Sequence, residues 1–140
     1  LDQLPPCLKL HTHHGIRKKW HNQHVAQQVI DRVYLGSVHA ARNRQFLFEK
    51  RVTHILSVNH MRPPFPSEFQ YKLVREYDQP TSNLLQHLEE CFEFIDEALE
   101  NPQGSVLVHC AAGQSRSATV CVMFTNFVSH LEVLNIHVCC

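Results

Sequence analysis

The chain has no excess of charge of either sign and no long apolar run. Its thirteen Lys and Arg residues balance thirteen Asp and Glu residues, so nothing predicts binding to nucleic acid or to an anionic membrane surface. A transmembrane helix needs about 18 or more consecutive apolar residues, and no such run is present. A cleavable signal pattern is also absent. The 140 residues, 44% of them hydrophobic, are enough for one domain with a sizeable core.

The cysteines lack the regular spacing of a disulfide framework. The six are Cys7, Cys91, Cys110, Cys121, Cys139 and Cys140. Scattered cysteines without a secretory signal are typical of reduced thiols, so we expect a cytoplasmic or nuclear setting. Cys91 and Cys121 fall within apolar helical patterns and are expected to fill the core.

The first 24 residues are rich in histidine and follow no helical or strand period. Imidazoles bind zinc or nickel, but no cysteine or carboxylate cluster completes a site here. We therefore predict that residues 1–24 form a disordered tail without assigned function, and that residues 25–140 form the folded domain. Because the chain begins at Leu1 rather than Met, we expect a fragment or a processed chain.

Strand and helix patterns alternate through the rest of the chain. Strands are predicted at residues 30–35, 52–58, 71–77 and 106–109, and helices at residues 39–50, 84–99 and 118–128. This alternation predicts an α/β fold with a mostly parallel central sheet flanked by helices. The imperfect alternation of residues 71–77 places that strand toward an edge. Ligands of such sheets bind at the carboxyl ends of the strands.

Two predicted helices carry further local signals. In the first, Ala40, Ala41, Phe46 and Leu47 are expected to share one buried face. In the second, Asn83 is a credible N-cap because Gln86 follows three residues later as its reciprocal partner. The Asn-Pro-Gln-Gly sequence at residues 101–104 is expected to end this helix.

Residues 106–117 combine a short apolar strand, a turn-like loop and the start of an apolar helix. Backbone N–H groups and the positive end of the dipole converge at a helix N-terminus, which favours anions. At such a position the pKa of a cysteine falls from about 8.5 to roughly 3.5–7.5, so Cys110 is a candidate nucleophile. Arg116 can bind two phosphate oxygens with its planar guanidinium, and Gly113 permits a tight turn. This combination predicts a phosphoryl-transfer site.

The string His-Cys-Ala-Ala-Gly-Gln-Ser-Arg-Ser at residues 109–117 resembles the signature of the cysteine-dependent protein phosphatases, and of their dual-specificity branch in particular. The resemblance runs from about residue 30 to about residue 122 and includes residues 33–37, 52–58 and 71–74. Residues 78–88 are most similar to one subgroup, whose zinc-binding tail is absent here. Beyond about residue 122 the chain departs from the family, and residues 128–140 resemble none of the helices that complete the family's domain. We therefore expect a truncated domain with incomplete C-terminal helices and uncovered apolar surface around Val122, Phe124 and Phe127.

The resemblance implies hydrolysis of phosphotyrosine and phosphoserine or phosphothreonine through a cysteinyl phosphate. Cys110 is then the nucleophile, Asp78 the general acid, and Ser117 a hydrogen-bond donor to the sulfur. The phosphate is held by Arg116 and by the loop residues Ala111, Ala112, Gly113, Gln114 and Ser115. His109 orients the loop. The expected partners are phosphorylated proteins, without nucleic acid or membrane, and we expect neither a metal nor another cofactor.

Three other functions are compatible with parts of this pattern. A phosphoinositide or RNA phosphatase is disfavoured because residues 111–115 contain no basic side chain. A rhodanese-like sulfurtransferase also uses a cysteine in a loop, but it does not explain Arg116, Ser117 or Asp78. The serious rival is a catalytically weak or inactive fragment that binds phosphoproteins without turning them over.

Overall fold

A single five-stranded sheet organises the domain. The computed structural model describes the backbone of residues 26–138 and the side chains of residues 26–132. The strands lie in the order β1-β2-β5-β3-β4. Strands β2, β5, β3 and β4 run parallel, and only β1 is antiparallel to its neighbour. The predicted α/β class with a mostly parallel sheet is confirmed. The bounds are β1 Gln27–Ile30, β2 Val33–Gly36, β3 Val52–Val58, β4 Gln70–Val74 and β5 Ser105–His109.

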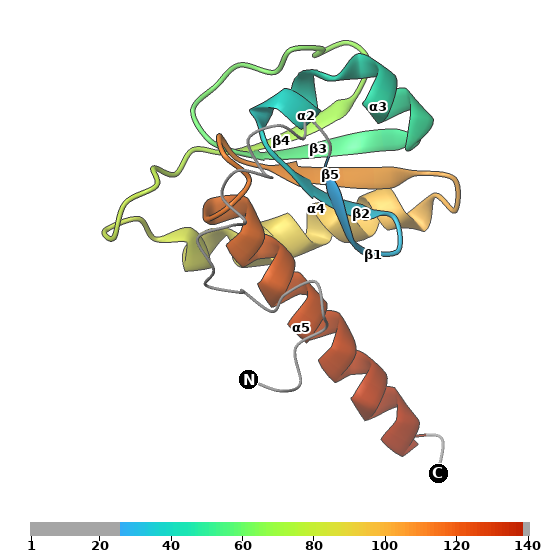
Figure 1. The fold of residues 1–140 in the computed structure, drawn as a ribbon. Helices are drawn as coiled ribbons and strands as arrows, with labels where there is room; N and C mark the ends of the chain where they lie inside the picture. The colour runs from blue at the N-terminus through green and yellow to red at the C-terminus, as the bar shows by residue number, and fades with distance from the viewer. Residues whose placement is uncertain (1–25, 139–140) are drawn as a thin grey trace, which may run out of the picture.

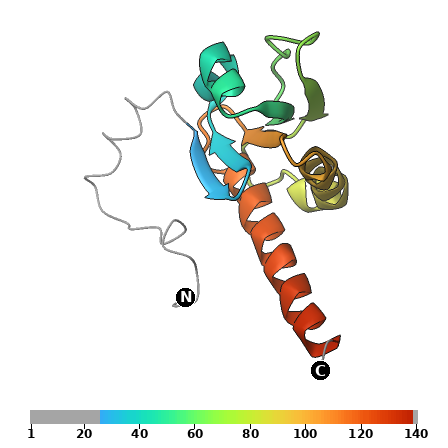
Figure 2. The same cartoon turned by 90° about the vertical axis from the view of Figure 1, so that its right-hand side faces the viewer.

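Helices cover both faces of the sheet (Figure 1). Helices α2 (Val38–Arg42) and α3 (Arg44–Glu49) pack on one face. On the other face lie the 3-10 turn η2 (Leu84–His87), helix α4 (Leu88–Glu100) and helix α5 (Arg116–Val138). Figure 2 shows the same layers from the side.

Strand β5 lies at the centre of the sheet and is buried along its whole length. Successive side chains of a strand point to opposite faces. Accordingly, Val106 and Val108 join the core under α4 and α5, whereas Leu107 joins the core under α2 and α3. A strand buried on both faces is a continuous apolar run, which is why this segment was recognisable in the sequence.

The segment predicted as a single strand at residues 30–35 belongs to a hairpin of two strands, β1 and β2. The turn between them uses Arg32 at a φ of 60°. One nitrogen of the Arg32 guanidinium donates to the carbonyl oxygens of Leu99 at 3.2 Å and Asn101 at 2.8 Å. These bonds fix the turn against the end of α4, a long-range contact that local sequence patterns do not encode.

The predicted helix at residues 39–50 is divided at Asn43. The Asn43 side chain accepts a hydrogen bond from the backbone N–H of Phe46 at 3.0 Å, while its own N–H donates to the carbonyl of Ala40 at 3.1 Å. One residue therefore ends α2 and begins α3. The shared apolar face is confirmed, because Ala40, Ala41, Phe46 and Leu47 are all buried.

Two boundaries around α4 differ from the prediction. Strand β4 is an edge strand as expected, but it ends at Val74 rather than at residue 77. The expected capping by Asn83 is wrong, because its side chain makes no cap hydrogen bond. Its intended partner Gln86 donates instead to Glu76. The chain enters α4 through the η2 turn, and the helix ends at Glu100 as predicted.

Helix α5 begins at Arg116 and continues to Val138, ten residues beyond the predicted end. Its C-terminal part extends away from the sheet (Figures 1 and 2). Phe124 is only 1% exposed, so the expectation that it is uncovered is wrong, and Val122 is half-buried. Phe127 is 44% exposed, as expected, and Met123 and Leu131 join it. No helix among the described residues is long and apolar enough to cross a membrane.

Several predicted features lie outside the described residues. These are the histidine-rich segment 1–24 together with Cys7, Cys139 and Cys140. Cys91 and Cys121 are buried free thiols in the core, as expected.

Two phenylalanines on α5 provide a matched test of how this helix is anchored. The Phe124 ring contacts Phe92 of α4 edge-on, with 5.4 Å between ring centroids. We expect Phe124→Ala to lower the free energy of unfolding by about 3–5 kcal/mol, because it leaves a cavity in the core. Phe127→Ala at the exposed site should cost about 1 kcal/mol or less. Urea unfolding of both variants measures this, and similar losses would contradict the packing described.

Candidate active site

The loop from Cys110 to Ser115 connects the carboxyl end of β5 to the first residue of α5. It packs against the start of α2, where the backbone N–H of Val38 donates to the carbonyl of Ala111 at 3.2 Å. Gly113 has a φ of 71°, and a Cβ there would lie 2.7 Å from the carbonyl oxygen of Gly36. Only glycine meets both conditions without strain, so the sequence prediction for this residue is explained.

The sulfur of Cys110 is buried and surrounded by donors. The backbone N–H of Gly113 lies 3.2 Å from it, and the Ser117 hydroxyl donates to it at 3.1 Å. Burial alone raises the pKa of this thiol. Hydrogen bonds from the Ser117 hydroxyl and from the backbone N–H groups of Ser117, Gly113 and Gln114 outweigh burial, so the pKa of Cys110 lies below its usual value. The loop therefore favours a thiolate.

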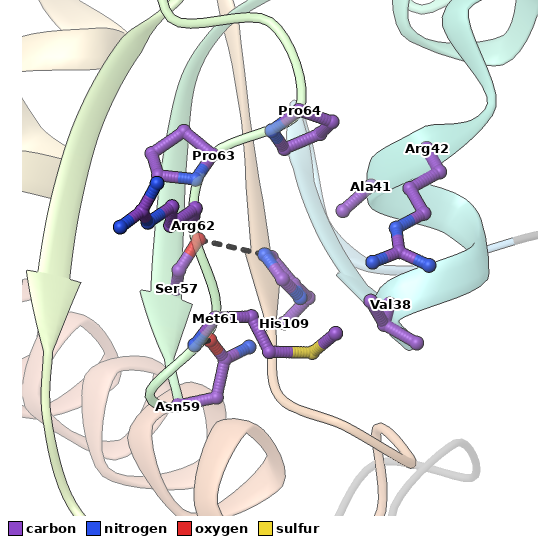
Figure 3. Close-up of a pocket in the computed structure, with 10 residues that line it drawn as sticks. All are labelled: Val38, Ala41, Arg42, Ser57, Asn59, Met61, Arg62, Pro63, Pro64 and His109. Atoms are coloured by element: carbon purple, nitrogen blue, oxygen red, sulfur yellow. Dashed lines mark hydrogen bonds between the residues drawn. The ribbon is translucent and has the colours of Figure 1, made fainter.

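His109 supports the loop by contacts with the Cys110 carbonyl and the Ser57 hydroxyl. Burial lowers its pKa to about 4, so the ring is neutral at pH 7. Its Nδ1 lies 3.3 Å from the carbonyl oxygen of Cys110, and its Nε2 lies 2.7 Å from the Ser57 hydroxyl. A carbonyl can only accept, so Nδ1 carries the proton and Nε2 accepts from Ser57. Figure 3 shows the ring pointing toward Ser57 at the edge of a small hollow between α2 and the loop after β3.

Arg116 is half-buried at the first position of α5. One of its terminal nitrogens donates to the backbone carbonyl of Glu76 at 3.0 Å. Its Nε is buried and has no hydrogen-bond partner among the described residues. A buried donor without a partner is costly, and an anion held by the loop satisfies such a donor.

Asp78 lies on the loop at residues 75–83, hereafter the acid loop, which connects β4 to η2. Its carboxylate accepts a hydrogen bond from the Ser115 hydroxyl at 2.8 Å. The structure thus brings the exposed Asp78 to the rim of the loop that holds Cys110 and Arg116. Among the residues described, no group of three or more His, Cys, Asp or Glu side chains could hold a metal ion.

Sequence analysis did not identify three residues that support the site. Ser57 binds His109 from strand β3, and Glu76 binds Arg116 through its carbonyl. His87 in turn contacts the Glu76 carboxylate from η2. No local spacing signals these pairs, because 52, 40 and 11 residues separate their members. They become neighbours only through the parallel sheet and the acid loop.

Comparison with known proteins shows the family to which the chain belongs. Residues 33–132 match the family described as dual specificity phosphatase, catalytic domain. Dual specificity protein phosphatase 1 of Arabidopsis thaliana is 43% identical over 110 residues, covering 78% of this chain and 55% of that protein. Dual specificity protein phosphatase 19 of Mus musculus is 45% identical over 91 residues, covering 64% of this chain and 41% of that protein. The crystal structure of DUSP15 matches with a TM-score of 0.71 at 30% identity, covering 75% of this chain and 67% of that one.

The chain therefore belongs to the dual specificity phosphatase catalytic domain family. It spans about half the length of the Arabidopsis relative. The subgroup that residues 78–88 suggested, that of dual specificity protein phosphatase 12, is not singled out by these comparisons, since the relatives described above are other members of the family.

The buried neutral His109 makes stability depend on pH. Its pKa of about 4 lies below the ordinary 6.5, so the unfolded chain binds more protons between these values. The contribution of the neutral His109 ring to the free energy of unfolding is complete above pH 6.5. It is lost as the pH falls toward 4, by up to about 3 kcal/mol. His109→Gln should therefore flatten the dependence of the unfolding free energy on pH across this window. Denaturant unfolding at several pH values measures it.

The exposed His130 on α5 provides the control for this measurement. If His109→Gln and His130→Gln both leave the wild-type slope unchanged, His109 is not buried in its neutral form.

Proposed function

We propose that this chain hydrolyses phosphate monoesters on phosphorylated proteins, both phosphotyrosine and phosphoserine or phosphothreonine, with Cys110 as the nucleophile. The main observation that supports this proposal is the lowered pKa of the buried Cys110 thiol, which receives hydrogen bonds from a loop at a helix N-terminus. The family relationship supports the same reaction.

In the first step the Cys110 thiolate attacks phosphorus and the bond to the leaving oxygen breaks. Arg116 and the backbone N–H groups of the loop formed by Ala111, Ala112, Gly113, Gln114 and Ser115 hold the other three oxygens. The departing alkoxide or phenoxide takes a proton from Asp78, the candidate acid at the rim of the loop.

In the second step the ionised Asp78 removes a proton from water, which attacks the cysteinyl phosphate. The sulfur–phosphorus bond breaks, inorganic phosphate leaves, and Cys110 returns as a thiolate. Ser117, whose hydroxyl already donates to the sulfur, stabilises the departing thiolate. Each turnover restores the protonation states with which it began.

The remaining alternatives receive less support. Phosphoinositide or RNA substrates call for cations that residues 111–115 do not provide. A protein that only binds phosphoproteins requires the anion site alone. That function does not explain why the pKa of the Cys110 thiol is lowered or why a carboxylate lies at the rim.

A thiolate mechanism also requires a reducing compartment, so we propose that the protein acts in the cytoplasm or the nucleus.

Cys110→Ser tests the covalent mechanism. The anion site survives this change, because the backbone donors and Arg116 remain. Turnover of a phosphopeptide should therefore vanish, while binding measured by calorimetry persists. Turnover at the wild-type rate in this variant would exclude a cysteinyl phosphate, and an inactive wild type that still binds would favour the rival.

Asp78→Asn tests the acid. The rate on substrates with poor leaving groups should fall by about 10²–10⁴, because the leaving oxygen then departs without a proton. A substrate whose leaving group is already a weak base should lose far less. Steady-state kinetics on a matched pair of aryl phosphates measures both. An equal loss on the two substrates would make Asp78 structural and exclude it as the acid.

A further inference from the structure

A bridge of three side chains, Glu76, His87 and Glu90, connects the acid loop to helix α4. His87 Nε2 lies 3.1 Å from Glu76 Oε1, and His87 Nδ1 lies 2.7 Å from Glu90 Oε1. Glu76 belongs to the acid loop, His87 ends η2, and Glu90 lies in the first turn of α4. The imidazole therefore joins the acid loop to the helix that packs under the sheet.

Further contacts hold the two carboxylates in place. Glu76 accepts hydrogen bonds from the Ser82 hydroxyl at 2.6 Å and from the Gln86 amide at 3.3 Å. Glu90 forms an ion pair with Lys72 of β4. The side chains of Glu76 and His87 are 16% and 27% exposed, so solvent screens their interaction less than it screens an open surface pair. The hydrogen bond from Ser82 leads the contacts that lower the pKa of Glu76, with His87 adding to it.

The bridge depends on a side chain that presents two ring nitrogens on opposite sides. His87 Nε2 also lies 3.2 Å from the amide nitrogen of Gln86, which itself donates to Glu76. A side chain without polar atoms makes none of these contacts, and a single amide group cannot contact both carboxylates in the same way.

The bridge is connected to the reacting groups through Glu76. While the Glu76 carboxylate faces His87, its backbone carbonyl accepts the hydrogen bond from Arg116 at 3.0 Å. The next residue, Tyr77, stacks on His60 with 3.9 Å between ring centroids, and Asp78 follows. The position of Asp78 over the loop therefore depends on a residue that α4 fixes on one side and Arg116 fixes on the other.

We propose that His87 is a positioning residue for Asp78: it holds the acid loop so that the Asp78 carboxyl reaches the leaving oxygen. This inference rests on the proposed function. It states that His87, which lies outside the loop from Cys110 to Ser115, affects only the proton transfer. A misplacement of about 1 Å in a reacting group can lower a rate by about 10²-fold. We therefore expect His87 to matter where protonation limits the rate.

The test compares His87→Leu, which removes the contacts with both carboxylates, with His87→Gln, whose amide can keep one of them. With a poor leaving group, kcat should fall roughly tenfold or more for His87→Leu and less for His87→Gln. KM should stay near the wild-type value, and kcat with a good leaving group should change little. Glu89→Gln, an exposed neighbour in the same turn of α4, is the control and should behave like the wild type.

A double variant separates positioning from a general loss of structure. In the Asp78→Asn background, His87→Leu should cause no further loss with the poor leaving group, because the acid is already absent. Equal losses on both substrates, or losses that multiply with that of Asp78→Asn, overturn the proposal. If Asp78→Asn itself shows no dependence on the leaving group while the wild type turns over, the assignment of the acid fails instead. An inactive wild type refutes the proposed function.

Discussion

The lowered pKa of the buried Cys110 thiol is the feature around which the site is built. Burial by itself raises this pKa, and hydrogen bonds from Ser117 and Gly113 at the N-terminus of α5 outweigh the effect of burial. These donors point inward only because the loop turns tightly at Gly113, where a positive φ and the nearby carbonyl of Gly36 exclude any side chain. The same arrangement that stabilises a thiolate also suits the oxygens of a phosphate.

The sheet keeps this loop in place. Strand β5 is central, its register with β2 and β3 fixes the position of Cys110, and the α2 backbone closes on the loop at Ala111. On the opposite side, Arg116 and Ser115 contact the acid loop through Glu76 and Asp78. Two segments about 40 residues apart in the sequence thus share one rim, and each is fixed by hydrogen bonds to the other.

The parts of the fold that the sequence predicts well are those whose apolar pattern is decided by burial. Strand β5 contains the apolar run at residues 106–108 because both of its faces are covered, and strand β3 is rich in apolar and β-branched residues. The buried face of α4 repeats at helical spacing. Strand β1 escaped prediction because Gln27 and Gln28 lie at the edge of the sheet that the described residues form, where burial does not select apolar residues. The division at Asn43 and the η2 turn depend on single side-chain hydrogen bonds or on tertiary contacts, which no periodicity reveals.

The candidate site divides in the same way. Cys110, Gly113 and Arg116 lie in one short segment, so their chemistry could be predicted from their spacing, whereas the role of Ser117 was implied by the family resemblance. Asp78 accepts a hydrogen bond from Ser115 at the rim of the site, and its role as the acid stays a prediction. Ser57, Glu76 and His87 carry no signal in the sequence, because their relation to the site arises only when β3, the acid loop and η2 meet in space.

The most direct test of the account is the protonation state of Cys110 in the folded protein. The rate at which iodoacetamide alkylates Cys110 should be followed against pH by mass spectrometry, with the buried Cys91 and Cys121 as internal references, since burial raises their pKa values to about 12. The account predicts a midpoint for Cys110 below the ordinary value of about 8.5, and a higher midpoint when Ser117→Ala removes the hydroxyl donor. A midpoint at or above the ordinary value, unchanged by that substitution, would contradict it.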